Sequence, residues 1–335
     1  GDTSTELDVV ITKPPVSALS ILIRTRRDII VTALLQTTSP GADIVLEADS
    51  DMDGVGGVRI SDAGSMASGR HVLISGSDFS ATPGAIDSVL TEAGSAGDHI
   101  SAAGDIRIVS NIWAPAGAIV SVAGSVHATD GGLIAVEAEG DAVIAGDLET
   151  SGRIDLSSKT GAIDQSVGSI VTDLLAVTTN GGSVTFTGPL TINTMVDVDP
   201  TGGNVTIVNP ANQLGVLELS GDHVTVQEVD DMEIGSITAT ASVTLTSGDA
   251  VLDANAGGVN IISPILTIDA AGGAGTVLDA LDTTVDTLMV TVDDGDVYVD
   301  NTTTLEIAGI TIDTSGSVAT TALGAINVTG NITVP

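Results

Sequence analysis

The chain has 335 residues, of which 42% are hydrophobic, while only 1% are aromatic and none is cysteine. It carries 44 acidic and 9 basic side chains, which gives a formal net charge of −35. The absence of cysteine excludes disulfide scaffolds, thiolate metal sites and cysteine nucleophiles. The acidic charge argues against binding to nucleic acid and to an anionic membrane surface.

Short runs of alternating apolar and polar residues recur along the chain. In the N-terminal half they are Ile44-Val-Leu46, Val58-Arg-Ile60, Val72-Leu-Ile74, Ile106-Arg-Ile108, Ile134-Ala-Val136 and Ile154-Asp-Leu156. A period of two places one side of a strand in a core and the other side in solvent. Each run predicts a strand of about three to five residues, which is too short to be stable alone.

From residue 184 onward, strands of the form Val-Thr-apolar repeat. They begin at Val184, Val205, Val224 and Val243. Other alternating runs lie between and after them: Leu217-Glu-Leu219, Val259-Asn-Ile261, Leu266-Thr-Ile268, Val297-Tyr-Val299, Leu305-Glu-Ile307, Ile310-Thr-Ile312 and Ile326-Asn-Val328. Like residues in like places, at a nearly constant interval, are typical of stacked coils that hydrogen-bond to one another.

We therefore predict an all-β fold, a parallel β-helix (β-solenoid) with about 20 residues per coil. About 17 such coils, spaced by about 4.8 Å, would form a column on the order of 80 Å long. Residues 1–335 are expected to form one continuous solenoid, with looser coils and all basic residues in 1–160 and regular acidic coils in 161–335. The alternative is a string of β-sandwiches, which usually need aromatic anchors that this chain largely lacks.

Several segments combine glycine and aspartate with such an alternating run. They are the stretch from Gly41 to Ile60, Gly161-Ala-Ile-Asp-Gln165, Leu266-Thr-Ile-Asp-Ala-Ala-Gly-Gly273 and Gly295-Asp-Val-Tyr-Val-Asp-Asn301. They resemble the filamentous-haemagglutinin-type repeats of large bacterial exoproteins. The resemblance implies a right-handed β-helical shaft of a secreted or cell-surface protein, often an adhesin or a matrix component. The Asn-Pro-Asn turn of that family's secretion domain is not matched by Asn209-Pro-Ala-Asn212, so no functional residue is carried over.

The sharpest local motif is Asp49-Ser-Asp51-Met-Asp53-Gly54. Alternating carboxylates followed by glycine are typical of the start of a calcium-binding loop. The oxygen ligand expected six residues after the glycine is missing, because Ile60 stands there; Asp62 or Glu47 is the available substitute. The motif therefore predicts a calcium site at Asp49, Asp51 and Asp53, with an acidic corner between two strands as the alternative. Asp293-Asp294-Gly295-Asp296 is interpreted as a solvated turn.

Paired carboxylates of the kind that a glycoside hydrolase needs are found in two clusters. They are Asp197 with Asp199, and Asp230 with Asp231 and Glu233. After Lys159 there is no Lys or Arg, while 22 acidic residues follow. Such a field repels anionic substrates, so we interpret both clusters as solvated surface and predict that the protein is not an enzyme.

The histidines are His71, His99, His127 and His223. No two of them have metal-ligand spacing, and we expect exposed corner residues. The basic cluster Arg24, Arg26 and Arg27 is suited to an acidic neighbour, such as a second copy of the chain.

Together these observations predict a structural extracellular or cell-surface protein of bacterial type, an adhesin-like fibre, shaft or matrix component. Its expected partners are further coils or other copies of the chain, end to end or side by side, and a surface glycan or protein receptor. Nucleic acid and membrane insertion are not expected, and calcium is the one candidate cofactor. The chain begins at Gly1 and ends at Pro335 inside a strand pattern, which suggests a segment of something longer. A polysaccharide-active β-helix enzyme and a calcium-stiffened adhesin are the alternatives.

Overall fold

The computed structural model describes residues 9–13, 15–51, 55–61, 64–77, 87–91, 100–110, 114, 117–255 and 257–335. These residues form strands and turns, and no helix occurs among them. The chain divides into two compact units, Gly1–Gly182 (the N-terminal unit) and Ser183–Pro335 (the C-terminal unit). Each unit is a parallel β-solenoid, and the chain makes about 14 turns of roughly 21 residues. The predicted all-β, parallel β-helical fold is confirmed.

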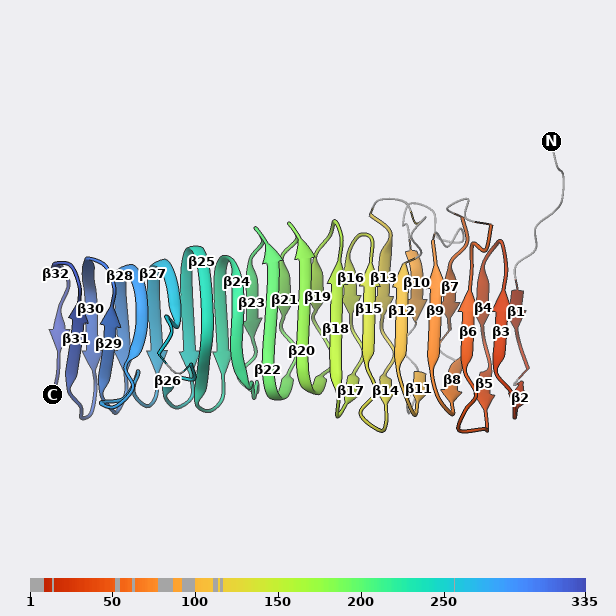
Figure 1. Ribbon diagram of the computed structural model, residues 1–335, viewed down its shortest axis with the longest axis horizontal. Helices are drawn as coiled ribbons and strands as arrows, with labels where there is room; N and C mark the ends of the chain where they lie inside the picture. The colour runs from red at the N-terminus through yellow and green to blue at the C-terminus, as the bar shows by residue number, and fades with distance from the viewer. Residues whose placement is uncertain are drawn as a thin grey trace. The chain divides into compact units, whose positions relative to one another are not determined.

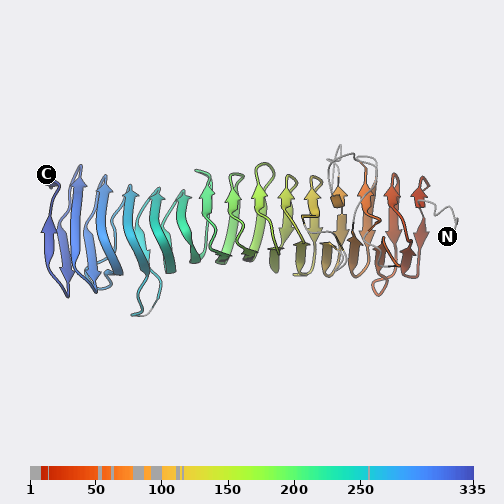
Figure 2. The same cartoon turned by 90° about the horizontal axis from the view of Figure 1, so that it is seen from above.

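Each coil of the N-terminal unit contributes one strand to each of three parallel sheets, whose strands lie side by side along the stack (Figures 1 and 2). The first sheet contains β1 (Val9–Ile11), β4 (Ile29–Val31), β7 (Val58–Ile60), β10 (Asp87–Thr91), β13 (Ile119–Val122), β16 (Ala142–Ile144) and β19 (Ile163–Gln165). The second contains β2 (Val16–Ser17), β5 (Leu34–Thr37), β8 (Ser65–Ser68), β11 (Ile100–Ala102), β14 (Val126–Ala128) and β17 (Leu148–Thr150). The third contains β3 (Ile21–Arg24), β6 (Ile44–Glu47), β9 (Val72–Gly76), β12 (Ile106–Ser110), β15 (Ile134–Ala138) and β18 (Arg153–Ser158). The long β20 (Ile170–Asn180) pairs with both β17 and β18.

The strands of the C-terminal unit are longer, because the chain often turns a corner without leaving the strand conformation. They are β21 (Val184–Phe186), β22 (Leu190–Thr201), β23 (Val205–Val208), β24 (Val216–Glu228), β25 (Met232–Ser247), β26 (Val251–Asp253), β27 (Ile261–Ala270), β28 (Leu281–Val292), β29 (Val297–Asn301), β30 (Leu305–Ile312), β31 (Val318–Ala322), β32 (Ile326–Val328) and β33 (Ile332–Thr333). Strand β24 alone includes two runs that the sequence pattern separates, Leu217–Leu219 and Val224–Val226. The expectation of uniformly short strands is therefore wrong for this unit.

The Val-Thr-apolar repeats stack in register, as the sequence predicts. Val184 pairs with Val205, Val205 with Val224, and Val224 with Val243. The pairing continues with Leu266 in the next coil. All of these pairings are parallel, which excludes the hairpin-linked β-sandwich alternative for this unit.

The number of coils is smaller than the sequence spacing predicts, about 14 instead of about 17. The excess residues lie in the first coils of the N-terminal unit. Ile29 pairs with Val58 there, an interval clearly longer than the one between Val120 and its partner Ala142 further along the same sheet. A coil can hold extra residues in a corner loop without any change in the pairing of its strands.

The core is a set of aliphatic columns. In the N-terminal unit Ile44, Val72, Ile106, Ile134 and Ile154 occupy matched positions on successive strands of the third sheet. Each of them is at most 1% exposed. Burial of such side chains is worth roughly 1.5–3 kcal/mol each, as an upper bound. A column of this kind leaves little room for aromatic rings, which agrees with the composition.

Close stacking of the coils also dictates glycine at some corners. A Cβ atom at Gly248 would lie 2.0 Å from the carbonyl oxygen of Val229 in the coil before it. At Gly181 the backbone has φ +89°, a left-handed conformation that favours glycine. The sequence pair Asn180-Gly181 therefore marks a coil corner rather than a hairpin.

Candidate functional site

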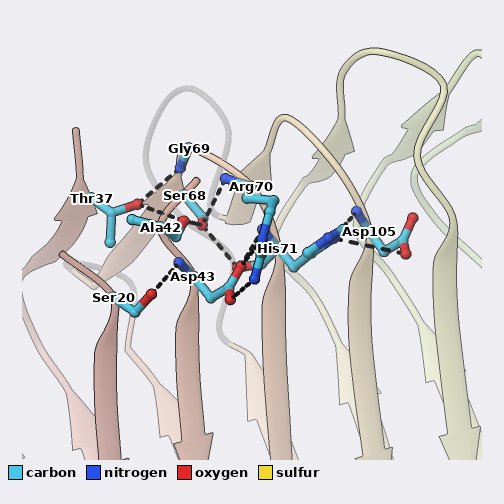
Figure 3. A network of polar contacts seen from close by, with 9 residues as sticks. All are labelled: Ser20, Thr37, Ala42, Asp43, Ser68, Gly69, Arg70, His71 and Asp105. Carbon is cyan, nitrogen blue, oxygen red and sulfur yellow. Dashed lines mark hydrogen bonds and ion pairs between the residues drawn. The ribbon is translucent and has the colours of Figure 1, made fainter. Parts of the chain in front are cut away.

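A column of polar side chains lies at the corner that precedes the third sheet of the N-terminal unit (Figure 3). Ser20, Asp43, His71 and Asp105 occupy the position directly before β3, β6, β9 and β12. Each side chain accepts a hydrogen bond from the backbone N–H one coil further on. The lengths are 3.0 Å from Asp43 N to Ser20 Oγ, 3.3 Å from His71 N to Asp43 Oδ1, 2.9 Å from Asp105 N to His71 Nδ1, and 3.0 Å from Leu133 N to Asp105 Oδ1.

Arg70 is held against this corner column by Asp43. Its Nε donates to Asp43 Oδ1 at 2.7 Å, and its Nη2 donates to Oδ2. The hydrogen bonds and positive charge of the Arg70 guanidinium lower the pKa of Asp43. His71 Nδ1 accepts the Asp105 N–H, so the neutral imidazole carries its proton on Nε2. The histidine therefore holds two coils together, in agreement with the predicted corner position.

Buried hydroxyl groups complete the same corner from the inside (Figure 3). Thr37 Oγ1 donates to the carbonyl oxygen of Ala42 at 3.2 Å and accepts from Gly69 N at 2.9 Å. In the next coil Ser68 Oγ makes hydrogen bonds of 3.0 Å to Ala42 O and 2.8 Å to His71 O. The Thr37 and Ser68 hydroxyls therefore give the Ala42 carbonyl and the Gly69 N–H partners at the turn, as buried backbone groups require.

Corner carboxylates act in the same way at other places. In the C-terminal unit Asp231 Oδ1 accepts from Ala250 N at 3.1 Å, and Asp296 Oδ1 accepts from Ser317 N at 2.7 Å. The hydrogen bonds from the Ser317 hydroxyl and N–H lower the pKa of Asp296. Part of the acidic composition therefore serves coil-to-coil hydrogen bonding.

A depression of about 480 Å³ lies on the outer face of the third sheet in the N-terminal unit. Two ion pairs line it, Arg24 with Glu47 and Arg107 with Glu137. An adjoining depression of about 210 Å³ shares Glu137 and contains a third pair, Arg153 with Asp155. We call the two together the outer groove.

Of the three predicted calcium ligands, Asp49 lines the outer groove. Asp49 is fully buried, with φ +54°, and its Oδ2 accepts from the Ser77 hydroxyl at 2.5 Å. Asp51 forms an ion pair of 4.0 Å with Arg26. Asp53 and the suggested substitute Asp62 lie outside the described residues. Among the described residues no group of three or more acidic or histidine side chains is placed to hold a metal ion, so the calcium site stays a prediction.

The other predicted carboxylate pair lies in a shallow depression of about 200 Å³ in the C-terminal unit. Asp197 is in register with Glu218 of the next coil, and that glutamate is in register with Ser236. Asp199 accepts from the Ser220 hydroxyl at 2.6 Å, and Glu218 accepts from the Ser236 hydroxyl at 2.8 Å. The partner that register gives to Asp197 is therefore Glu218, which the sequence alone does not suggest.

The remaining histidines differ in their surroundings. His127 is in register with Glu149, and both line a depression of about 160 Å³ together with Asp147. His223 Nδ1 lies 2.8 Å from the Ser242 hydroxyl. His99 is outside the described residues.

Glu228, which sequence reasoning missed, is the most unusual acid of the C-terminal unit. It is 2% exposed, and its Oε1 accepts from Leu214 N at 2.6 Å. Its Oε2 is buried and has no hydrogen-bond partner in the described part of the chain. Burial raises the pKa of Glu228 to about 9, with a contribution from the negative charges of Asp230 and Glu233. Strand alternation could have found it, because Val224, Val226 and Glu228 share the inward parity.

No family model matches the chain, and neither a curated protein nor a solved structure matches it. No helix long and apolar enough to cross a membrane occurs among the described residues. The architecture agrees with the solenoid fold that the haemagglutinin-type resemblance implies.

Proposed function

We propose that the protein is a structural, adhesin-like solenoid of a bacterial surface or extracellular matrix, related in type to filamentous-haemagglutinin repeats. It spaces or presents binding surfaces and is not an enzyme. The corner columns carry this proposal. Side chains that could perform chemistry, such as His71, Asp105 and Asp231, accept backbone hydrogen bonds from the adjacent coil. The atoms that would act on a substrate are therefore engaged in holding neighbouring coils together.

The proposed partners follow from the distribution of charge along the chain. The C-terminal unit has 20 acidic residues and no Lys or Arg, whereas all nine basic residues are in the N-terminal unit. Such an imbalance suits contacts between copies of the chain, end to end or side by side, and disfavours nucleic acid. An extracellular setting with salt or divalent cations would relieve the self-repulsion of the acidic unit.

Electron microscopy and native mass measurement of the purified chain test the proposal. We expect slender particles that associate into longer species. A compact, monodisperse particle with the mass of a single chain would contradict the fibre or shaft role.

A polysaccharide-active enzyme is the second candidate, favoured by the register of Asp197 and Glu218. Adjacent strands lie about 4.8 Å apart, close to the carboxylate separation of about 5–5.5 Å in retaining glycoside hydrolases. Against it, Glu218 is engaged by Ser236 and the depression is shallow. Assays of reducing-sugar release from a panel of polysaccharides, with Asp197→Asn as the inactive control, decide between the two functions.

A further inference from the structure

The outer groove crosses the strands of the third sheet in the N-terminal unit. One row of outward positions along it is continuous in register: Arg24, Glu47, Ser75, Val109, Glu137, Ser157 and Thr178. The two depressions cover this row from β3 to β20. Six strand spacings of about 4.8 Å give the row a length of roughly 29 Å, so its shape suits a linear ligand that lies along the stack.

The side chains that line the outer groove offer fixed donors and acceptors. Arg107 Nη2 donates to Glu137 Oε1 at 2.5 Å, and Arg24 Nη2 donates to Glu47 Oε1 at 3.3 Å. A guanidinium has five N–H donors, so each arginine keeps further donors for a ligand. The Ser75 and Ser157 hydroxyls make no hydrogen bond within the described part of the chain.

Charge selects the class of ligand. In the outer groove each positive side chain is balanced by a carboxylate, whereas the chain as a whole has a net charge of −35. An anionic polymer would be repelled by the overall negative charge and would find no cation without a carboxylate partner in the groove. A cation would find Glu47, Glu137 and Asp155 already paired with arginines, and Asp49 already bonded to the Ser77 hydroxyl. A neutral ligand with many hydroxyl groups is neither repelled by the negative charge nor dependent on an unpaired carboxylate. Each of its hydroxyls can donate to a carboxylate and accept from a guanidinium.

An aliphatic row lies beside the polar one. Leu22, Val45 and Leu73 occupy matched outward positions on β3, β6 and β9, and Leu22 is 57% exposed. Arg107 follows them in the same row and reaches across to Glu137. The surface therefore has an apolar strip next to a polar strip, which matches the apolar C–H face and the hydroxyl-bearing edge of a sugar ring.

We propose that the outer groove binds a linear, uncharged polysaccharide, with the glycan chain running across the strands from β3 toward β20. This site names the class of ligand that the proposed adhesin-like protein binds. The biological role of the site rests on that proposed function. Binding itself does not depend on whether the chain assembles into fibres.

Calorimetric titration of the full chain with neutral hexasaccharides tests the site. The probes are cellohexaose, maltohexaose and laminarihexaose, with a hexamer of galacturonic acid as the anionic comparison. The groove variant combines Arg107→Gln with Glu137→Gln. The control combines Arg70→Gln with Asp43→Asn, which removes another arginine–carboxylate pair, located where the strands of the same sheet begin.

We expect at least one neutral hexasaccharide to bind, the groove variant to bind at least about tenfold more weakly, and the control to bind like the unaltered chain. Ser75→Gln, which adds bulk in the groove and keeps both ion pairs, should weaken binding as well if the double variant does not fold. Absence of binding by all three neutral probes, equal loss in the control, or preference for the galacturonate overturns the proposal. Particle shape and assembly of the same samples are recorded by electron microscopy, so a failure of the glycan site is distinguishable from a failure of the structural role.

Discussion

Inside the C-terminal unit, Glu228 Oε1 accepts a hydrogen bond of 2.6 Å from the backbone N–H of Leu214. The bond joins a corner loop to the end of β24, although the two residues are fourteen positions apart in the chain. Burial outweighs this hydrogen bond in its effect on the pKa of Glu228, which rises to about 9. The acid is therefore neutral in the folded protein at pH 7.

This burial predicts a stability that falls as the pH rises. The folded chain keeps a proton on Glu228 up to about pH 9, while the unfolded chain loses it near pH 4.5. The contribution of this group to stability is fully present below pH 4.5 and declines up to about pH 9, by about 2–4 kcal/mol between the lower limit and neutral pH. Glu228→Gln should remove this decline, as measured by urea unfolding across that range. Parallel pH profiles of the variant and the unaltered chain would refute the expectation, and Glu149→Gln, at an exposed position of β17, is the control.

The pair of Arg70 and Asp43 predicts the opposite behaviour in acid. Because Arg70 lowers the pKa of Asp43, the pair stabilises the folded state above the ordinary carboxyl pKa of 3.8, and this contribution disappears as the pH falls through the lower folded value. Arg70→Gln should therefore be less stable than the unaltered chain at pH 6, and the difference should shrink below pH 3. A difference that persists at pH 2 would show that Arg70 acts through packing instead of charge.

Thr150 illustrates the buried corner hydroxyls. Its Oγ1 donates to Gly132 O at 2.7 Å and accepts from Gly152 N at 3.1 Å. Thr150→Val keeps the shape and leaves both backbone groups without this partner, which should cost about 1–3 kcal/mol of unfolding free energy. Thr185→Val, on the outward side of β21, should change stability by less than about 0.5 kcal/mol. Equal effects in chemical unfolding would argue against the role of the inner hydroxyl.

Gly248 tests the tightness of coil stacking. Gly248→Ala would place a methyl group against the Val229 carbonyl oxygen, and we expect a loss of about 1–3 kcal/mol. A Cβ atom at Gly41 would meet no other atom within 4 Å, and this glycine has no positive φ. Gly41→Ala should therefore be neutral or stabilising by about 0.5–1 kcal/mol. Thermal melting of both variants tests this. A lower melting temperature for Gly248→Ala alone supports the clash, whereas an equal decrease in both variants would mean that replacing glycine is destabilising at either position.

The calcium prediction is open to a direct measurement. If Asp49, Asp51 and Asp53 form a site, CaCl₂ should raise the melting temperature more than NaCl at equal ionic strength, and Asp51→Asn should remove the difference. Equal stabilisation by the two salts would mean that calcium only screens the negative charge of the chain.

Strand positions and their stacking could be predicted from the sequence, because inward and outward residues alternate strictly. The ladder from Val184 to Val243 follows directly from the nearly constant interval between its valines. The number of coils could not be predicted as well, since the interval from Ile29 to Val58 is longer than the spacing of the alternating runs in the regular coils.

The outer groove could not be predicted from the sequence. Arg24, Arg107 and Arg153 are far apart in the chain, and they line one groove only because of the register of the third sheet. The clustered acids are a more conspicuous sequence pattern, although Asp231 and Asp296 accept corner hydrogen bonds. A corner carboxylate has a sequence signal, a polar residue directly before a strand, but this signal does not distinguish a structural acid from a functional one.

The corner column of Ser20, Asp43, His71 and Asp105 has a consequence for how such a chain can change length. Each of these side chains accepts a hydrogen bond from the coil that follows it, and serine, aspartate and histidine all serve at the same position. A duplicated or deleted coil would thus meet neighbours that already accept it. Recombination between repeats can lengthen or shorten the protein in steps of one coil while the rest of the structure keeps its contacts.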